Sequence, residues 1–155
     1  MPLVVDLDGT LTPSDTLHES AVRYALAHPF AAVVNIPKWL AQGRAMLKQN
    51  LAEAMPVEPE TLPYALAVRN QISQARSAGA EVVLSTASDA DTAHRIAEHL
   101  GVFDRVMASD GETNLAGANK ARALEDIYGA GQFDYIGNSK AALPDREKAR
   151  LSNVV

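Results

Sequence analysis

The fold of this chain is decided by its N-terminal stretch, Val4-Val5-Asp6-Leu7-Asp8-Gly9-Thr10-Leu11-Thr12. The apolar residues at its start are typical of a buried strand, and Gly9 indicates a sharp turn where that strand ends. Two carboxylates this close repel each other unless a cation or a shared proton compensates. The carboxyl end of a strand is also where open α/β sheets bind ligands. A plain surface turn is the alternative, but a carboxylate directly after an apolar strand is costly without a partner. We therefore favour a ligand site at Asp6 and Asp8.

The composition suits one domain with a substantial core, because 47% of the 155 residues are hydrophobic. The net charge is −5 and no basic tract stands out, so nucleic acid is not an expected partner. The absence of cysteine excludes disulfides, thiolate metal sites and cysteine nucleophiles. No signal peptide is evident, and no apolar run approaches the roughly 20 residues that span a bilayer. We therefore expect a cytoplasmic location.

The rest of the chain alternates strand-like and helix-like segments. Strands are expected at residues 3–5, 81–84, 105–108, 133–137 and 151–155, and helices at 16–27, 43–54, 64–78, 89–100 and 120–128. This alternation predicts an α/β fold with a parallel sheet covered on both faces. Right-handed crossovers place the carboxyl ends of the strands on one rim. Five polar residues are expected to converge there: Asp6, Asp8, Thr86, Lys120 and Asn138.

About fifty residues of helical character separate the first strand from the next. They are too many for a simple crossover, so we predict an inserted helical cap at 14–63 and a core domain made of 1–13 and 64–155. Helices that merely complete the core are the alternative. Within the cap, residues 30–40 are strongly apolar, and Pro37 is expected to kink or end a helix there. We favour the core of the cap for this segment, with a docking face for a membrane or partner protein as the alternative.

These motifs together resemble the haloacid dehalogenase (HAD) superfamily, whose first motif is Asp-x-Asp-Gly-Thr. Asp6 and Asp8 match that motif, Thr86 matches the second-motif hydroxyl, Lys120 the third-motif lysine, and Asn138 falls in the fourth motif. The resemblance implies a HAD-like Rossmannoid three-layer sandwich with a parallel sheet and a small helical cap inserted after the first strand.

At finer grain the chain is similar to the phosphatase-like domain fused N-terminally to UbiA-type membrane prenyltransferases. The stretches that carry this similarity are 5–20 (Val-Asp-Leu-Asp-Gly-Thr-Leu-Thr-Pro-Ser-Asp-Thr-Leu-His-Glu-Ser), 84–89 (Leu-Ser-Thr-Ala-Ser-Asp), 109–117 (Ser-Asp-Gly-Glu-Thr-Asn-Leu-Ala-Gly) and 133–139 (Phe-Asp-Tyr-Ile-Gly-Asn-Ser). The chain stops inside its last predicted strand, so we expect a domain cut from, or descended from, a longer protein. A prenyltransferase domain or the inner face of the membrane is then an expected partner.

The resemblance implies a phosphatase that acts on a small phosphorylated metabolite or a prenyl-linked sugar phosphate. Asp6 would be the nucleophile that becomes an aspartyl phosphate. Asp8 would protonate the leaving oxygen and then deprotonate the attacking water. Thr86, the backbone at Ala87 and Lys120 would bind the phosphoryl oxygens.

The resemblance also implies a Mg²⁺ ion held by Asp6, Asp8 through its backbone carbonyl, and the fourth motif. That motif is usually Gly-Asp-Ser-x-x-Asp, whereas this chain has Asn138 and Ala142 at the acidic positions. An amide oxygen can still ligate Mg²⁺, but one negative charge is missing, so we expect weak binding. Asp145 is a candidate to compensate. A catalytically impaired HAD-fold module that regulates or partners a membrane prenyltransferase is the alternative function.

Overall fold

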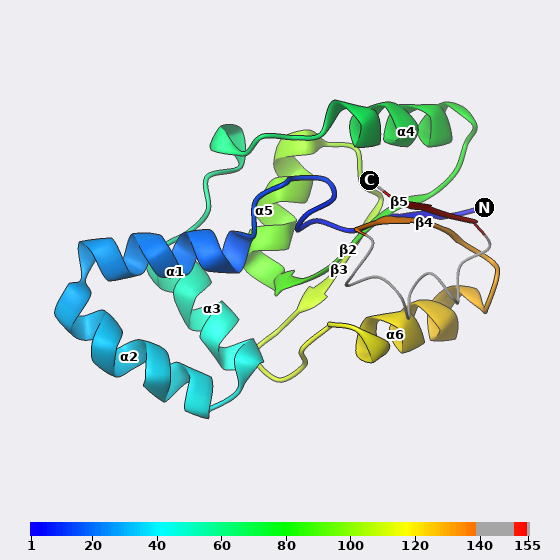
Figure 1. Cartoon of the computed structure of the whole chain (residues 1–155). Coiled ribbons are helices and arrows are strands. Elements are labelled where there is room, and N and C mark those ends of the chain that lie inside the picture. The colour runs from blue at the N-terminus through cyan, green and yellow to red at the C-terminus, as the bar shows by residue number, and fades with distance from the viewer. Residues whose placement is uncertain (139–150, 155) are drawn as a thin grey trace.

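A single parallel sheet organises the computed structural model, which describes residues 1–138 and 151–154. Its five strands within those residues are β1 (Leu3–Val5), β2 (Val82–Asp89), β3 (Arg105–Ser109), β4 (Asp134–Gly137) and β5 (Leu151–Val154). They are hydrogen-bonded in the order β3-β2-β1-β4-β5, and every pairing is parallel (Figure 1). The first strand therefore lies at the centre of the sheet, and its carboxyl end lies between those of β2 and β4.

Helices cover both faces of this sheet. The helices within the described residues are α1 (Thr16–Ala27), α2 (Pro29–Ala41), α3 (Arg44–Ala54), α4 (Leu66–Ser77), α5 (Ala90–Leu100) and α6 (Ala118–Tyr128), with the 3₁₀ helix η1 at Pro59–Thr61. Helices α4 and α5 pack on one face and α6 on the other (Figure 1). The predicted three-layer HAD-like sandwich is confirmed.

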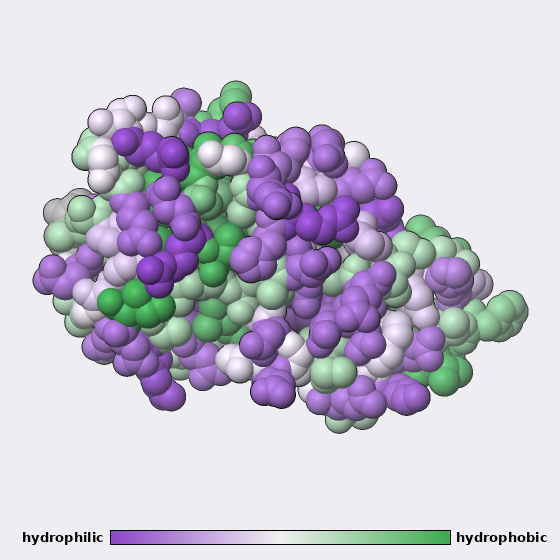
Figure 2. Space-filling model, turned by 180° about the vertical axis from the view of Figure 1, so that it is seen from behind, coloured by the Kyte–Doolittle hydropathy of each residue, from purple (hydrophilic) through white to green (hydrophobic). Residues whose placement is uncertain are grey.

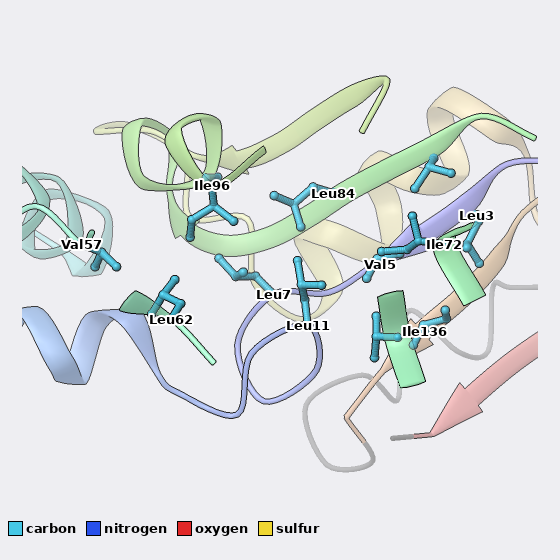
Figure 3. Close-up of a cluster of buried hydrophobic side chains, with 13 residues drawn as sticks. Leu3, Val5, Leu7, Leu11, Val57, Leu62, Ile72, Leu84, Ile96 and Ile136 are labelled. Atoms are coloured by element: carbon cyan, nitrogen blue, oxygen red, sulfur yellow. The ribbon is translucent and has the colours of Figure 1, made fainter. Parts of the chain in front are cut away.

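The side chains of β1 alternate between the two faces of the sheet, and both faces are buried. Leu3 and Val5 contribute to the cluster that α4 and α5 cover, which includes Ile72 and Ile96 (Figure 3). Val4 points to the opposite face, where it packs with Leu124 of α6 in a second cluster. A strand covered on both sides is apolar at every position rather than at alternate ones. The apolar strand ends at Val5, and Asp6 is the first polar residue after it.

Helices α1, α2 and α3 are inserted between β1 and α4 and form the predicted cap. They enclose a small cluster of their own around Tyr24, Ala32 and Leu51. The two connections between the cap and the core run side by side, because the Ala65 N–H donates to the Leu11 carbonyl at 2.9 Å. The boundaries 1–13, 14–63 and 64–155 remain a prediction.

The prediction that residues 30–40 form the core of the cap is wrong for most of that segment. Phe30 is 91% exposed, Val33 76% and Val34 64%. Figure 2, which views the molecule from behind, shows hydrophobic atoms at the end formed by the cap. Pro37 does not end the helix either, since α2 continues to Ala41. Val33 and Pro37 are both exposed, so water can replace the hydrogen bond that Pro37 cannot donate.

The second strand is longer than the expected 81–84. It continues to Asp89, because pairing with β3 resumes between Asp89 and Ser109 after a register irregularity. Thr86 consequently lies inside β2 rather than beyond its end. The irregularity lies between Ser85 and Asp89, just beyond Leu84, the last residue of β2 that pairs with β1.

Candidate active site

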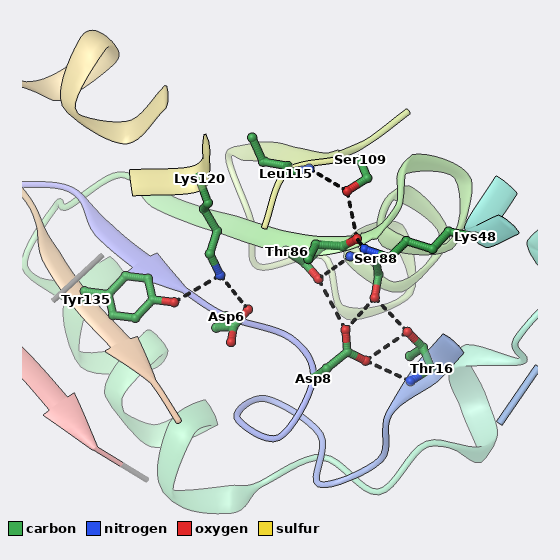
Figure 4. Close-up of polar contacts among 11 residues, drawn as sticks. Asp6, Asp8, Thr16, Lys48, Thr86, Ser88, Ser109, Leu115, Lys120 and Tyr135 are labelled. Atoms are coloured by element: carbon green, nitrogen blue, oxygen red, sulfur yellow. Dashed lines mark hydrogen bonds and ion pairs between the residues drawn. The ribbon is translucent and has the colours of Figure 1, made fainter. Parts of the chain in front are cut away.

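A buried ion pair lies at the carboxyl end of the central strand (Figure 4). Asp6 directly follows β1, and its N–H donates to the Ile136 carbonyl of β4 at 3.0 Å. Lys120, in the first turn of α6, donates from Nζ to Asp6 Oδ1 at 3.0 Å and to the Tyr135 hydroxyl at 3.1 Å. The Asp6 and Lys120 side chains are only 10% and 6% exposed. Burial raises the pKa of Asp6 above its usual range, and the Lys120 ammonium opposes that shift.

The Asp8 carboxylate is fixed by hydroxyl and amide donors rather than by a cation. Its Oδ1 accepts from both the N–H and the hydroxyl of Thr16, each at 2.8 Å. Its Oδ2 accepts from the Ser88 hydroxyl at 2.5 Å and from the Thr86 hydroxyl at 3.4 Å. Thr86 Oγ1 also accepts from the Ser88 N–H at 3.0 Å. Thr16, the first residue of α1, and the last residues of β2 together hold this carboxylate (Figure 4).

Lys48, in the cap, forms hydrogen bonds to two residues of the core. From α3 it donates to the Ala87 carbonyl and, at 2.7 Å, to Asn114 Oδ1. The Ser109 hydroxyl donates to the same Ala87 carbonyl at 2.7 Å. Burial and the neighbouring Arg44 guanidinium lower the pKa of Lys48. Ala87, expected to face phosphate, thus has its carbonyl held by the cap and by β3.

Asn138 follows β4, which neighbours β1 in the sheet. Its amide lies against the turn of the first motif, since a Cβ on Gly9 would be 2.7 Å from Asn138 Nδ2. Among the described residues, no cluster of three or more His, Cys, Asp or Glu side chains has the arrangement of a metal site. Asp6 and Asp8, which the sequence motifs name as ligands together with Asn138, follow β1, and Asn138 follows the neighbouring strand β4. Ala142 and Asp145 lie outside the described residues.

The sequence motifs assign no role to several polar residues of this site. Thr16 and Ser88 bind Asp8, Tyr135 binds Lys120, and Lys48 reaches the end of β2. The N-caps of α1 and α5 are Asp15 and Asp89, whose side chains accept backbone hydrogen bonds. The neighbouring hydroxyls are therefore left to bind Asp8.

A comparison with protein-family models shows to which family the chain belongs. The family model for haloacid dehalogenase-like hydrolases matches residues 3–141. The chain belongs to this family. Among curated proteins, an uncharacterised protein, y4nM, of Sinorhizobium fredii is 42% identical over 149 residues. That alignment covers 96% of this chain but only 28% of the relative, so this HAD-like hydrolase corresponds to little more than a quarter of that protein.

Solved structures agree on the fold. A HAD-family hydrolase of Salmonella enterica serovar Typhi superposes with a TM-score of 0.67 at 12% identity, covering 96% of this chain and 60% of that one. A phospho-aspartyl intermediate analogue of phosphoserine phosphatase gives 0.66 at 17% identity, covering 99% and 85%. CbbY of Rhodobacter sphaeroides, bound to a xylulose bisphosphate, gives 0.64 at 12% identity, covering 99% and 86%. At these identities the likeness establishes the fold of the HAD-like hydrolase.

Replacing Gly9 by alanine tests the close packing of the first motif. Gly9 has a φ of 72°, a left-handed conformation that costs an L-residue about 1–2 kcal/mol. The new methyl group would also meet Asn138. Gly79→Ala is the matched control, because Gly79 has a φ of 74° and nothing within 4 Å of a Cβ. We expect both variants to lower the free energy of unfolding in urea, and Gly9→Ala to lower it more. Equal losses would contradict the contact with Asn138.

Asp89 is predicted to make the stability of this HAD-like hydrolase pH-dependent. Burial raises the pKa of Asp89 above 3.8 although the Asp91 N–H donates to its carboxylate. The folded state therefore binds more protons than the unfolded state just above pH 3.8, and stability falls as the pH rises through the folded pKa. Asp89→Asn keeps the helix cap and should remove this loss, so that its advantage over wild type grows with pH in urea titrations.

Asp110→Asn is the control of opposite sign. Hydrogen bonds from the Thr113 and Glu112 N–H groups lower the pKa of the exposed Asp110. Wild type should therefore lose stability relative to this variant as the pH falls through the folded pKa. Parallel pH profiles for wild type and Asp89→Asn would contradict the penalty assigned to Asp89.

Proposed function

We propose that this HAD-like hydrolase is a phosphatase that hydrolyses phosphate monoesters through an aspartyl phosphate on Asp6. The observation that carries the proposal is the pair of carboxylates that follow β1 and have different surroundings. Asp6 is buried against an ammonium group, whereas both oxygens of Asp8 are held by hydroxyl groups. Two acids with distinct environments are suited to distinct roles in one reaction.

The first step forms the covalent intermediate. A carboxylate oxygen of Asp6 attacks phosphorus, the bond from phosphorus to the ester oxygen breaks, and a protonated Asp8 gives its proton to that leaving oxygen. In the second step water attacks phosphorus, Asp8 takes a proton from the water, and the bond from phosphorus to Asp6 breaks. Inorganic phosphate leaves, and Asp8 is again protonated. The contacts of Asp8 with Thr16 and Ser88 would orient it for both transfers.

The phosphoryl oxygens would be held by Thr86, the backbone N–H of Ala87 and Lys120. Thr86 and Ala87 belong to β2, and Lys120 belongs to the first turn of α6. The contacts of Lys120 with Asp6 and of Thr86 with Asp8 support this assignment. Fixed donors aimed at developing charge stabilise a transition state more than a ground state. Lys120 would also balance the charge of the phosphoryl group beside Asp6.

Mg²⁺ fits this site through oxygen donors alone. Asp6, the Asp8 backbone carbonyl and Asn138 would hold it, and hard cations of this kind prefer such ligands. Burial raises the pKa of Asp6, so an added positive charge would favour the ionised nucleophile. When bound, the ion would supply electrostatic stabilisation of the phosphoryl oxygens. The amide at residue 138 in place of a carboxylate makes this binding weak.

The substrates that suit the proposal are small phosphorylated metabolites and prenyl-linked sugar phosphates. The reaction would take place in the cytoplasm. A second candidate function is a HAD-fold module without turnover that regulates a larger protein, such as a membrane prenyltransferase. Two observations favour it: the loss of the acid at Asn138, and the match to only 28% of the length of the relative y4nM.

Phosphate release from 4-nitrophenyl phosphate and from isopentenyl phosphate, with and without Mg²⁺, tests the two functions. Turnover that needs Mg²⁺ and rises through millimolar concentrations supports the phosphatase. If wild type and Asn138→Asp both release no phosphate at saturating Mg²⁺, the phosphatase proposal fails and the module without turnover stands.

A further inference from the structure

Helix α2 is apolar at every position except Asn35 and Lys38, but it is covered on one side only. Its inner side packs through Ala32 and Trp39, and Asn35 Nδ2 donates to the Tyr24 hydroxyl at 2.8 Å. A helix that is hydrophobic all round is normally buried. Here the outer side leaves large apolar side chains in water, which indicates that something outside the described residues covers it.

The uncovered side chains form one face, which we call the α2 face. Its members are Leu26 at the end of α1 and Phe30, Val33, Val34, Lys38 and Leu40 on α2. The apolar members are between 51% and 91% exposed. Phe30, Val34 and Lys38 are spaced four residues apart, so they lie on the same side of the helix. The α2 face therefore combines large apolar groups with a cation.

The charge around this face differs from that of the rest of the chain. Residues 20–52 contain no Asp or Glu and, besides the buried Lys48, three Arg or Lys, although the whole chain carries a net charge of −5. Lys38 and Arg44, at the end of α2 and the start of α3, are exposed. An anionic surface would thus be attracted to this end of the molecule and repelled by the remainder.

The position of α2 leaves the face accessible. Helix α2 lies at the end of the molecule away from the sheet, and its helix partners are α1 and α3 (Figure 1). Within the described residues, no helix has the length and apolar character needed to cross a bilayer. Helix α2 has 13 residues and is about 20 Å long, so it would have to lie along a surface.

We propose that the α2 face docks this protein onto an anionic lipid membrane. The apolar side chains would enter the boundary between headgroups and acyl chains, while Lys38 and Arg44 would contact anionic headgroups. Interfacial helices bind through this combination of buried apolar area and basic charge, and they need no matching groove. The proposal concerns a surface on the cap and does not depend on phosphatase activity.

Flotation with lipid vesicles tests the proposal on the 155-residue chain. Wild type should float with vesicles of phosphatidylcholine and phosphatidylglycerol, and much less with phosphatidylcholine alone. The double variant Phe30→Ser/Val34→Ser should bind at least about tenfold more weakly, since two large apolar groups no longer enter the lipid. Lys38→Glu should also weaken binding. Leu66→Ser is the matched control, because Leu66 on α4 is 73% exposed and lies outside the α2 face.

Other results of these measurements would contradict membrane docking by the α2 face. Absence of wild-type binding to anionic vesicles at low ionic strength would overturn the proposal. So would equal binding by Phe30→Ser/Val34→Ser and wild type when circular dichroism shows both to be folded. Sedimentation that shows a dimer dispersed by that double variant, without vesicle binding, would assign the α2 face to a second copy of the chain instead.

Discussion

Asp6→Asn is expected to abolish phosphate release from 4-nitrophenyl phosphate, lowering kcat by at least about 10³-fold. An amide keeps the shape of the side chain but is not a nucleophile toward phosphorus. The same change leaves Lys120 without the carboxylate that lies 3.0 Å from its Nζ. Because a buried charge without its partner is destabilising, thermal unfolding should be measured alongside the kinetics, and activity should be assayed well below the melting temperature.

Asp8→Asn is the matched comparison, since it removes the other carboxylate of the same motif. The nitrophenolate leaving group needs little protonation, so the first step should survive in this variant. The second step should slow, because no base remains to take the proton of water. Rapid-quench measurements should therefore show a burst of nitrophenol followed by slow turnover in Asp8→Asn and no burst in Asp6→Asn. A burst in Asp6→Asn would remove the covalent mechanism.

Asn138→Asp is expected to strengthen Mg²⁺ binding by up to about 10³-fold. At an effective dielectric of about 20 and a separation of about 4 Å, a pair of unit charges is worth roughly 4 kcal/mol. Each 1.4 kcal/mol changes an affinity about tenfold. Solvent screening reduces the gain, and the double charge of the ion increases it. Isothermal titration calorimetry on wild type and variant measures the change directly.

Asn70→Asp is the control for this prediction, because it adds the same charge at an exposed position of α4. Its Mg²⁺ affinity should equal that of wild type. The Mg²⁺ concentration that half-activates phosphate release should fall in Asn138→Asp by about the same factor as the dissociation constant. If neither constant changes, residue 138 is not a ligand and the metal site must be placed elsewhere.

The layout of the candidate site follows from the sequence because parallel strands end on one edge of a sheet. That rule alone places Asp6 and Asn138 at neighbouring strand ends, with the helix that carries Lys120 beginning nearby. Side-chain partners do not follow in this way. Several hydroxyl groups cluster near residues 14–16 and 85–88, and periodicity does not say which of them turns toward Asp8. Only the packed structure assigns Thr16 and Ser88 to it.

The prediction that favoured burial of residues 30–40 over a docking face is wrong for a different reason. An apolar segment such as residues 30–40 predicts burial, and it does so whether the covering surface lies in the same chain or outside it. The sequence around Phe30 is the same in both cases. The length of β2 was missed because its polar residues after Leu84 lack a strand pattern, while its pairing with Ser109 depends on a partner distant in sequence.

Fluorine NMR of the chain with Mg²⁺, beryllium and fluoride tests the central claim without knowledge of the substrate. Beryllium fluoride attaches to a carboxylate oxygen and resembles a bound phosphoryl group, so it reports whether Asp6 can carry one beside Thr86 and Lys120. We expect bound fluoride signals that require Mg²⁺, strengthen in Asn138→Asp and vanish in Asp6→Asn. Signals that persist in Asp6→Asn, or that stay absent from both wild type and Asn138→Asp at saturating Mg²⁺, would contradict an aspartyl phosphate on Asp6.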